Sequence, residues 1–279
     1  MTSIRHLPFV QEGPLQGLAQ GVTVEIGGIP ILLESRDFEF CRMIEQRYAG
    51  FVNSGASPAY RFEIDLEPPS APPDEDARVS KHGRWWLFER GDFRAEWDTE
   101  SRRGLVHQSA NPYSVDTVLR IVHSLVLAEE GGFLLHSASA VRFGRAFLFT
   151  GISGAGKTTI SRLAPEDAEV LTDEISYVRP SARGYCAYGT PFAGELARVG
   201  ANLCAPVAAL YFLEKGPVNR IEPIGKLHAA RALLRNILFF AHDEWLVKRV
   251  FEAALEFVSR VTVARLVFTP DVRVWKLIA

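Results

Sequence analysis

Apolar and polar residues alternate in the first part of the chain, as expected for β-strands with one buried face. The alternation covers residues 22–26, and after two glycines a second apolar run covers 29–33, which predicts a hairpin. Apolar residues spaced three or four positions apart between residues 38 and 48 predict a short helix. Further short strands are predicted at 85–88, 93–97 and 105–108.

In the second part of the chain, the apolar positions predict helices as well as strands. A helical stripe covers residues 114–129 and ends at a pair of glycines, which is typical of a helix C-terminus. From residue 133 onwards apolar strands are separated by glycine-bearing turns and helices, the pattern of an α/β domain. Strands are predicted at 133–136, 146–150, 168–171, 208–213, 220–224 and 263–268, and helices directly after the glycine loop, at 226–239 and at 243–258. We therefore predict a small strand-rich α+β domain at residues 1–115 and an α/β domain at residues 116–279.

Composition and charge narrow the class of protein. The chain has 279 residues, of which 47% are hydrophobic and 23% charged, a mixture that is typical of folded proteins and excludes extended disorder. The formal net charge of −2 provides no global field that attracts nucleic acid, so we expect no nucleic-acid partner. No apolar run approaches the about 20 residues of a membrane span, and no secretory leader is recognisable, which predicts a cytoplasmic protein without a membrane partner.

The segment 151–158 matches the phosphate-loop pattern G-x-x-x-x-G-K-[ST] at every fixed position. An apolar strand precedes it and a helical segment follows it; without this context it would be a glycine-rich turn with a surface lysine. Glycines allow backbone N–H groups to surround a phosphate, and the new helix directs its positive end at the same anion. We expect Lys157 to neutralise the β- and γ-phosphates of ATP and the Thr158 hydroxyl to ligate Mg²⁺. The predicted nucleotide-binding residues are Gly151, Ser153, Gly154, Ala155, Gly156, Lys157, Thr158 and Thr159.

Two acidic residues follow the next predicted strand. Thr172, Asp173 and Glu174 follow the segment 168–171, and Asp173 lies 16 residues after Lys157 (173 − 157). One helix and one strand fill this interval, so we expect the pair at the edge of the sheet where open α/β proteins bind ligands. One carboxylate would hold Mg²⁺ together with Thr158, and the other would accept the proton of an attacking hydroxyl. The alternative is a solvated turn, because Asp is common in turns.

His136 ends an apolar run and lies 15 residues before Gly151 (151 − 136). A strand here would pack beside the strand that leads into the glycine loop and bring the imidazole to the same edge of the sheet. There it would orient Asp173, share a proton with it or contact phosphate. The alternative is a buried structural histidine, which is the commoner role of a histidine on an apolar strand.

Three segments in this order and spacing resemble the HPr kinase/phosphorylase family, whose fold is related to that of ATP-dependent phosphoenolpyruvate carboxykinase. They are Gly-Phe-Leu-Leu-His at 132–136, the glycine loop at 151–158 and Leu-Thr-Asp-Glu at 171–174. The segments 188–195 and 266–271 are similar to the broader group of HPr-kinase-related bacterial kinases. The resemblance implies an α/β fold, with a P-loop kinase core of the HPr kinase/phosphoenolpyruvate carboxykinase type and a small strand-rich N-terminal domain.

The resemblance also implies an activity and catalytic roles. The activity is ATP-dependent phosphorylation of a serine hydroxyl, with Asp173 as the base and His136 assisting it. The family has Asp at the position of Glu174, and its Glu-x-Arg-Gly-type segment is not recognisable near Glu195 and Arg198. We therefore expect neither HPr as the substrate nor phosphorolysis. Members of that family assemble into rings, so a homo-oligomer is compatible with the resemblance.

We therefore expect an enzyme, a Mg²⁺·ATP-dependent kinase that transfers the γ-phosphate to a hydroxyl, in the first place that of serine, of a peptide, protein or small molecule. Its expected catalytic residues are Asp173, His136 and Lys157. Two alternatives stay open. One is a nucleotide-binding regulatory module without transfer activity, and the other is carboxykinase-like chemistry on a small acid, for which the sequence has no matching arginine pattern.

Overall fold

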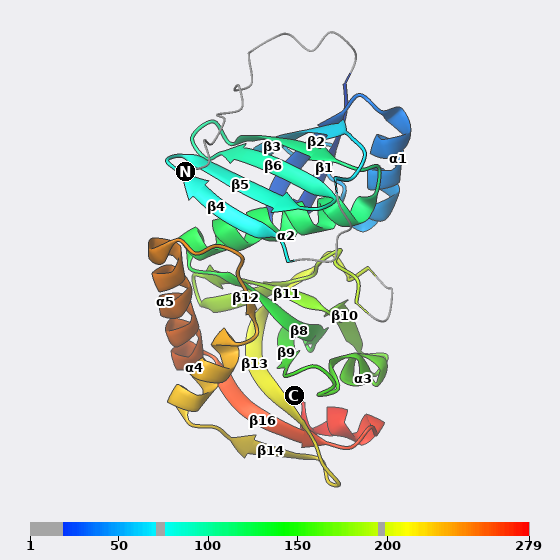
Figure 1. The fold of residues 1–279 in the computed structure, drawn as a ribbon. Coiled ribbons are helices and arrows are strands. Elements are labelled where there is room, and N and C mark those ends of the chain that lie inside the picture. The colour runs from blue at the N-terminus through cyan, green and yellow to red at the C-terminus, as the bar shows by residue number, and fades with distance from the viewer. Residues whose placement is uncertain (1–18, 71–75, 195–198, 279) are drawn as a thin grey trace.

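The computed structural model describes residues 19–70, 76–194 and 199–278. Two mixed β-sheets dominate it, since 41% of the described residues lie in strands and 28% in helices. The described strands form a seven-stranded sheet in the N-terminal part and a nine-stranded sheet in the rest of the chain. Figure 1 shows the two sheets one above the other, with α2 (Pro112–Glu130) between them.

The N-terminal sheet has the strand order β1-β2-β3-β7-β6-β5-β4. Its strands are β1 (Gln20–Ile26), β2 (Ile29–Ser35), β3 (Tyr60–Leu66), β4 (Arg78–His82), β5 (Trp85–Arg90), β6 (Phe93–Asp98) and β7 (Arg103–Gln108). The predicted hairpin is confirmed as β1 and β2, and the predicted short helix as α1 (Phe38–Arg47), which a 3₁₀ turn (Ala49–Phe51) follows. The other three strands predicted in this part are confirmed as β5, β6 and β7.

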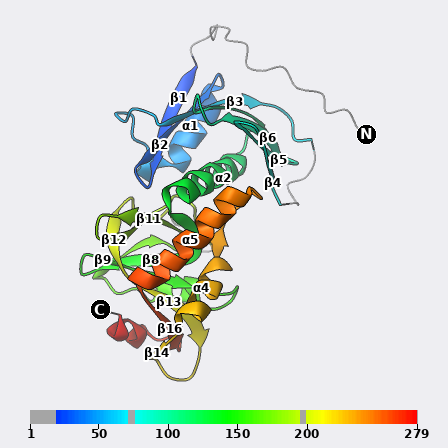
Figure 2. The same ribbon diagram turned by 90° about the vertical axis from the view of Figure 1, so that its left-hand side faces the viewer.

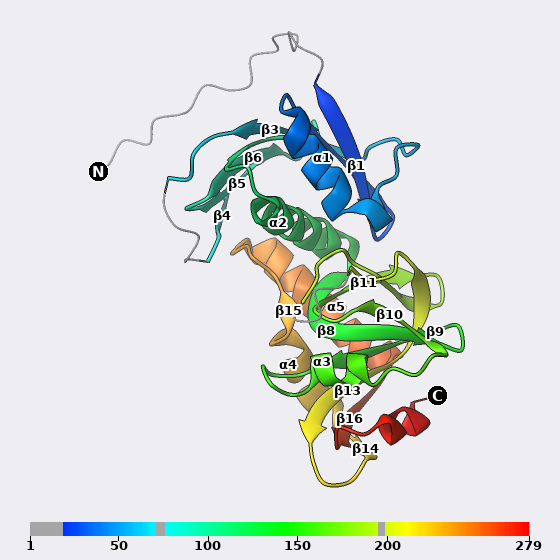
Figure 3. The same cartoon turned by 90° about the vertical axis from the view of Figure 1, so that its right-hand side faces the viewer.

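The second sheet has the order β10-β8-β11-β12-β13-β16-β14, with β9 paired to β8 and β13 and β15 paired to β8. Its strands are β8 (Phe133–Arg142), β9 (Arg145–Thr150), β10 (Ala168–Thr172), β11 (Ile175–Ser181), β12 (Gly184–Tyr188), β13 (Cys204–Lys215), β14 (Arg220–Pro223), β15 (Ile237–Leu238) and β16 (Thr262–Phe268). The helices of this part are α3 (Lys157–Arg162), α4 (Lys226–Leu234), α5 (Glu244–Arg260) and a 3₁₀ helix (Val272–Leu277). Helices α4 and α5 pack on one face of the sheet (Figure 2), and α3 lies on the opposite face (Figure 3).

The predicted α/β fold class, a P-loop kinase core of the HPr kinase type, is wrong. Strands β8 and β9, and then β11 and β12, are joined by tight hairpin turns rather than by helices. In the first turn Phe143 and Gly144 both have positive φ, 52° and 70°, as a two-residue hairpin turn of type I′ requires. The glycine-bearing turns between apolar segments therefore close antiparallel hairpins, and the result is a mixed sheet and not an alternation of strands and helices.

One predicted helix also ends early. The helix expected at 226–239 stops at Leu234, and the chain continues into β15, where Ile237 pairs with Leu135 of β8. Asn236 ends the helix. Its side chain donates to the Ala232 carbonyl, and its backbone carbonyl accepts the N–H of His136. Hydrogen bonds to β8 thus replace the last helical turn.

Helix α2 belongs to both halves of the molecule. Its N-cap is Asn111 and its C-terminus is closed by Gly131 in the left-handed conformation, with φ 78°. One hydrophobic cluster combines buried residues of the N-terminal sheet and α2 with Leu134 of β8 and Tyr177 of β11. The predicted domain boundary between residues 115 and 116 falls inside this helix. No described helix is long and apolar enough to cross a membrane.

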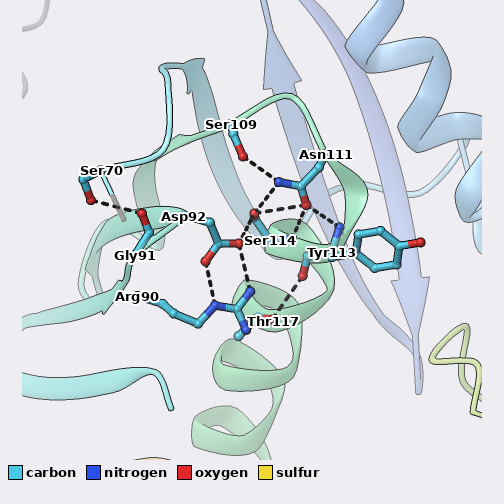
Figure 4. A network of polar contacts seen from close by, with 9 residues as sticks. All are labelled: Ser70, Arg90, Gly91, Asp92, Ser109, Asn111, Tyr113, Ser114 and Thr117. Carbon is cyan, nitrogen blue, oxygen red and sulfur yellow. Dashed lines mark hydrogen bonds and ion pairs between the residues drawn. The ribbon is translucent and has the colours of Figure 1, made fainter. Parts of the chain in front are cut away.

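A polar network holds the N-terminus of α2 on the N-terminal sheet (Figure 4). Arg90 donates two hydrogen bonds to Asp92, of 2.6 and 2.9 Å, and Ser114 Oγ donates a third of 2.6 Å. Burial opposes the charge of Asp92, but these hydrogen bonds prevail and lower its pKa. The Asn111 side chain accepts the first free N–H groups of the helix, from Tyr113 and Ser114. The network fixes where α2 starts, and with it the position of the side chains further along the helix.

Candidate functional site

The glycine loop connects the end of β9 to α3. Its three glycines have positive φ values, 156° at Gly151, 77° at Gly154 and 112° at Gly156. A Cβ atom at Gly156 would lie 2.7 Å from Phe268 Cζ, so the loop packs against the end of β16 in a way that only glycine permits. Residues Ser153 and Gly154 are exposed, Ala155 is buried, and Thr158 and Thr159 lie in the first turn of α3.

Lys157 lies inside this loop. Its side chain is only 8% exposed, and Nζ donates to the carbonyl oxygens of Gly151 (3.0 Å) and Ile152 (3.4 Å). The ammonium group therefore faces the loop backbone and not open solvent. Helix α3 has only six residues, so its dipole adds less to this site than the sequence pattern suggested, and the lysine and the loop backbone carry the site.

The acidic pair lies at the same sheet edge as the glycine loop. Ser139 of β8 pairs with Leu148 of β9 on one side and with Thr172 of β10 on the other, and both pairings are antiparallel. Strands β9 and β10 therefore run in the same direction and end at the same edge. Gly151 follows the first strand and Asp173 follows the second, as the spacing predicted.

The turn that carries the acidic pair is closely supported. Thr172 Oγ1 accepts the N–H groups of Glu174 and Ile175, both at 3.2 Å, and Asp173 Oδ1 accepts the N–H of Gly194 at 3.0 Å. A Cβ atom at Gly194 would lie 2.8 Å from Glu174 Oε2 and 3.0 Å from Asp173 Oδ2. The glycine thus lets the chain close directly over both carboxylates, and Asp173 is 4% exposed.

His136 joins the two parts of the site. Thr150 Oγ1, at the end of β9, donates to the His136 carbonyl at 2.8 Å, and His136 pairs with Ile175 of β11. Burial and then the charge of Lys157 lower the pKa of its imidazole, while Glu174 acts in the opposite direction. A lowered pKa keeps the ring neutral near pH 7, and a neutral imidazole can accept a proton.

Comparison with known protein families assigns this chain. Residues 107–278 match the family described as SynChlorMet cassette protein ScmC. The chain belongs to the ScmC family. No curated protein matches it.

The HPr kinase/phosphorylase assignment is therefore wrong, because the matching family is ScmC. The segments that suggested it, the glycine loop and the two strand ends beside it, meet at one sheet edge, but local motifs of this kind do not distinguish between families that share them. Glu195 and Arg198, which lie in the region compared with the Glu-x-Arg-Gly-type segment, are outside the described residues.

The part matched by the ScmC family includes α2, and this helix contributes a residue that the sequence did not single out. The guanidinium of Arg120 lies 4.9 Å from the centre of the Phe192 ring, and Phe192 is buried two residues before Gly194. No pattern in the sequence marks Arg120, but in the fold it lies between Leu119 and Ile121, which are both fully buried. Such a placement directs a charge into the protein and not into solvent.

Space for a substrate lies directly beside Asp173. A cavity of about 640 Å³ is bounded by Ser161 and Arg162 of α3, by Thr172 and Asp173, and by residues 199–201. A second cavity of about 510 Å³ lies in the N-terminal sheet, among the charged side chains around Arg90 and His107, and has no residue of the glycine loop or of the acidic pair. Of these two cavities, the first borders Asp173, although no residue of the glycine loop lines it.

The residues of this ScmC-family chain could supply part of a Mg²⁺ coordination shell but not all of it. Within the described ranges, no group of three or more His, Cys, Asp or Glu side chains could hold a metal ion by itself. Mg²⁺ at phosphate sites usually has one or two protein ligands and completes its shell with phosphate oxygens and water. Thr158 and the carboxylates of Asp173 and Glu174 supply that small donor set, so a metal that arrives with the nucleotide is compatible with them.

Proposed function

We propose that this protein is a Mg²⁺·ATP-dependent phosphotransferase that transfers the γ-phosphate to a hydroxyl, such as that of a serine, on a peptide, protein or small molecule. The observation that carries the proposal is the common sheet edge of the glycine loop, after β9, and the acidic pair, after β10. The name of the ScmC family mentions a cassette and no reaction, so the residues of the chain are what supports the proposal.

The loop is suited to hold the β- and γ-phosphates. Positive φ values at three glycines allow successive N–H groups to point toward one anion, and Lys157 supplies a charge that is already held against the loop. The Thr158 hydroxyl follows at the start of α3. Mg²⁺, bound with ATP, would neutralise phosphate charge, and Thr158 with Glu174 would hold it.

The acidic pair is suited to the acceptor. Asp173 is oriented by the Gly194 N–H and borders the cavity of about 640 Å³, so an acceptor hydroxyl in this cavity would reach its carboxylate. Asp173 would take the hydroxyl proton while the oxygen attacks the γ-phosphorus. The bond from that phosphorus to the bridging oxygen breaks, and ADP leaves with the electron pair. His136, neutral and close to Glu174, would help to hold this arrangement.

A transfer assay tests the proposal. The protein is incubated with Mg²⁺ and γ-labelled ATP, first with water as the acceptor and then with a peptide library and hydroxyl-bearing small molecules. We expect label transfer by the wild-type protein, its loss in Asp173→Asn, and loss of ATP binding in Lys157→Ala.

Asp167→Asn is the matched control, because Asp167 is an exposed residue paired with Arg142 at the other end of β10. ATP binding without transfer to any acceptor would identify a nucleotide-binding regulatory module instead. Full transfer by Asp173→Asn would exclude this residue as the base.

A further inference from the structure

Asp116, the acidic residue one helical turn before Arg120, already has other partners. Carboxylates and arginines four positions apart on a helix usually pair. Here Arg47 Nη2 contacts Asp116 Oδ2 at 2.5 Å, and the Tyr48 hydroxyl donates to Asp116 Oδ1 at 2.5 Å. Both carboxylate oxygens are engaged by α1 and the residue after it, so Arg120 interacts with Asp116 only at longer range and makes no direct contact with it.

Arg120 has no ion pair of its own in the described part of the chain. No described carboxylate lies within 4.0 Å of its guanidinium, and its buried Nε has no described hydrogen-bond partner. The contact that holds the group is the ring of Phe192, at 4.9 Å. A guanidinium that stacks on an aromatic face is held in a fixed plane and keeps the N–H groups at its edge available for an anion.

The position of Phe192 directs this charge to the candidate active site. Phe192 is two residues before Gly194, whose N–H donates to Asp173. Arg120 and Lys157 both lie close enough to His136 to lower the pKa of its imidazole. Burial lowers the pKa of Arg120, whereas Asp116 and then Glu174 favour its charged form, so Glu174 lies within electrostatic range of Arg120. The space around His136 is therefore within reach of two cations, one from the glycine loop and one from α2.

We propose that Arg120 binds the phosphoryl group that is transferred, the γ-phosphate of ATP. The inference rests on the proposed function, because it assumes that the glycine loop holds the nucleotide. A γ-phosphate next to Asp173 and Glu174 would face two carboxylates, and the planar guanidinium can offset this repulsion with two parallel hydrogen bonds to phosphate oxygens. As charge shifts in the transferring group, the same contact would stabilise it.

The test compares two nucleotides that differ by one phosphate. Dissociation constants for the β,γ-imido analogue of ATP and for ADP, both with Mg²⁺, are measured by calorimetry for the wild-type protein, Arg120→Gln and Arg120→Lys. We expect Arg120→Gln to weaken binding of the ATP analogue about tenfold or more, with ADP affinity within about twofold of wild type. Arg120→Lys keeps the positive charge and an aliphatic stem. Its affinity for the ATP analogue should therefore lie between those of the wild-type protein and Arg120→Gln.

Two control variants distinguish a failure of the role of Arg120 from a failure of the proposed function. Arg145→Gln removes another arginine that lies over an aromatic ring, 5.9 Å from Phe147, at the end of β9 away from the loop, and should change neither affinity. Lys157→Ala should weaken both nucleotides. Equal losses for both nucleotides in both Arg120 variants, or no loss in either, would overturn the role of Arg120 and leave the proposed function intact. A wild-type protein that binds neither nucleotide would overturn both.

Discussion

The Nε2 atom of His136 lies 3.7 Å from the Oε1 atom of Glu174, so the imidazole and one member of the acidic pair face each other. Their backbones are fixed by different contacts, since His136 is held by Thr150 of β9 and by Asn236, and the acidic turn is held by Thr172. The ring and the carboxylate therefore interact electrostatically without depending on one another for position.

The first prediction follows from this pair. Burial and the charge of Lys157 lower the pKa of His136, and the negative charge of Glu174 raises it. Glu174→Gln removes the raising influence, so the pKa of His136 should fall below its wild-type value, as followed by an NMR titration of the imidazole Cε1 proton. Glu169→Gln, on β10, is the control and should leave the titration unchanged. An unchanged or raised pKa in Glu174→Gln would show that the two groups are not coupled.

The second prediction concerns stability at low pH. His123 is fully buried against Tyr177, at 3.1 Å from its hydroxyl, and burial lowers the pKa of His123 to about 3 from an ordinary 6.5. Between these values the unfolded chain binds a proton that the folded protein does not, so stability falls as the pH falls, by about 1.4 kcal/mol per pH unit at most. Urea unfolding between pH 4 and 6.5 should show a smaller pH dependence in His123→Asn than in wild type. His82→Asn, at an exposed histidine, should keep the wild-type slope.

The third prediction addresses the contact between Gly194 and the acidic pair. A methyl group in Gly194→Ala would meet Glu174 Oε2 at 2.8 Å and Asp173 Oδ2 at 3.0 Å, so either the chain or the carboxylates must move. We expect phosphate transfer to fall roughly tenfold or more, because small displacements of reacting groups are costly, with little change in the thermal midpoint of unfolding. Gly50→Ala, where no atom lies within 4 Å of the new Cβ, should leave transfer unchanged. Wild-type turnover in Gly194→Ala would mean that the carboxylates do not require this contact.

The fourth prediction tests the buried network around Asp116. Tyr48 is fully buried, and its hydroxyl donates to Asp116. Tyr48→Phe leaves one carboxylate oxygen without this donor and should lower the free energy of unfolding by about 1–3 kcal/mol. Tyr113→Phe, where the ring is 67% exposed, should change it by less than about 0.5 kcal/mol in the same urea titration. Equal effects of the two substitutions would show that the Tyr48 hydroxyl contributes nothing specific.

The sequence predicts the local elements well and their assembly poorly. The period of apolar positions is a local property, so it found the β1–β2 hairpin, α2 and the strand before the glycine loop. Strand pairing is not local. β13 lies parallel to β9 and to β16, which are more than 40 residues away from it, and no periodicity indicates such partners. This is why an α/β alternation was predicted where a mixed sheet of hairpins forms.

The residues of the candidate site also differ in whether the sequence alone could predict them. The glycine loop and the acidic pair could be found because motif spacing and strand direction together place them at one edge. Arg120 could not be found in this way. The apolar stripe 114–129 is already accounted for by a core helix, and the Phe192 ring that holds the arginine comes 72 residues later in the chain (192 − 120). The role of Gly194 was missed for a similar reason, since only the folded chain brings it next to Asp173.

The place of α2 has a consequence for how the protein melts. Its buried residues share one cluster with both sheets, so neither half can lose its fold without exposing apolar surface of the other. The two sheets should therefore unfold as one cooperative unit, with a single calorimetric transition whose van't Hoff enthalpy equals the measured heat. A fragment that starts at β8 would leave apolar residues such as Leu134 and Tyr177 uncovered and would be prone to aggregate.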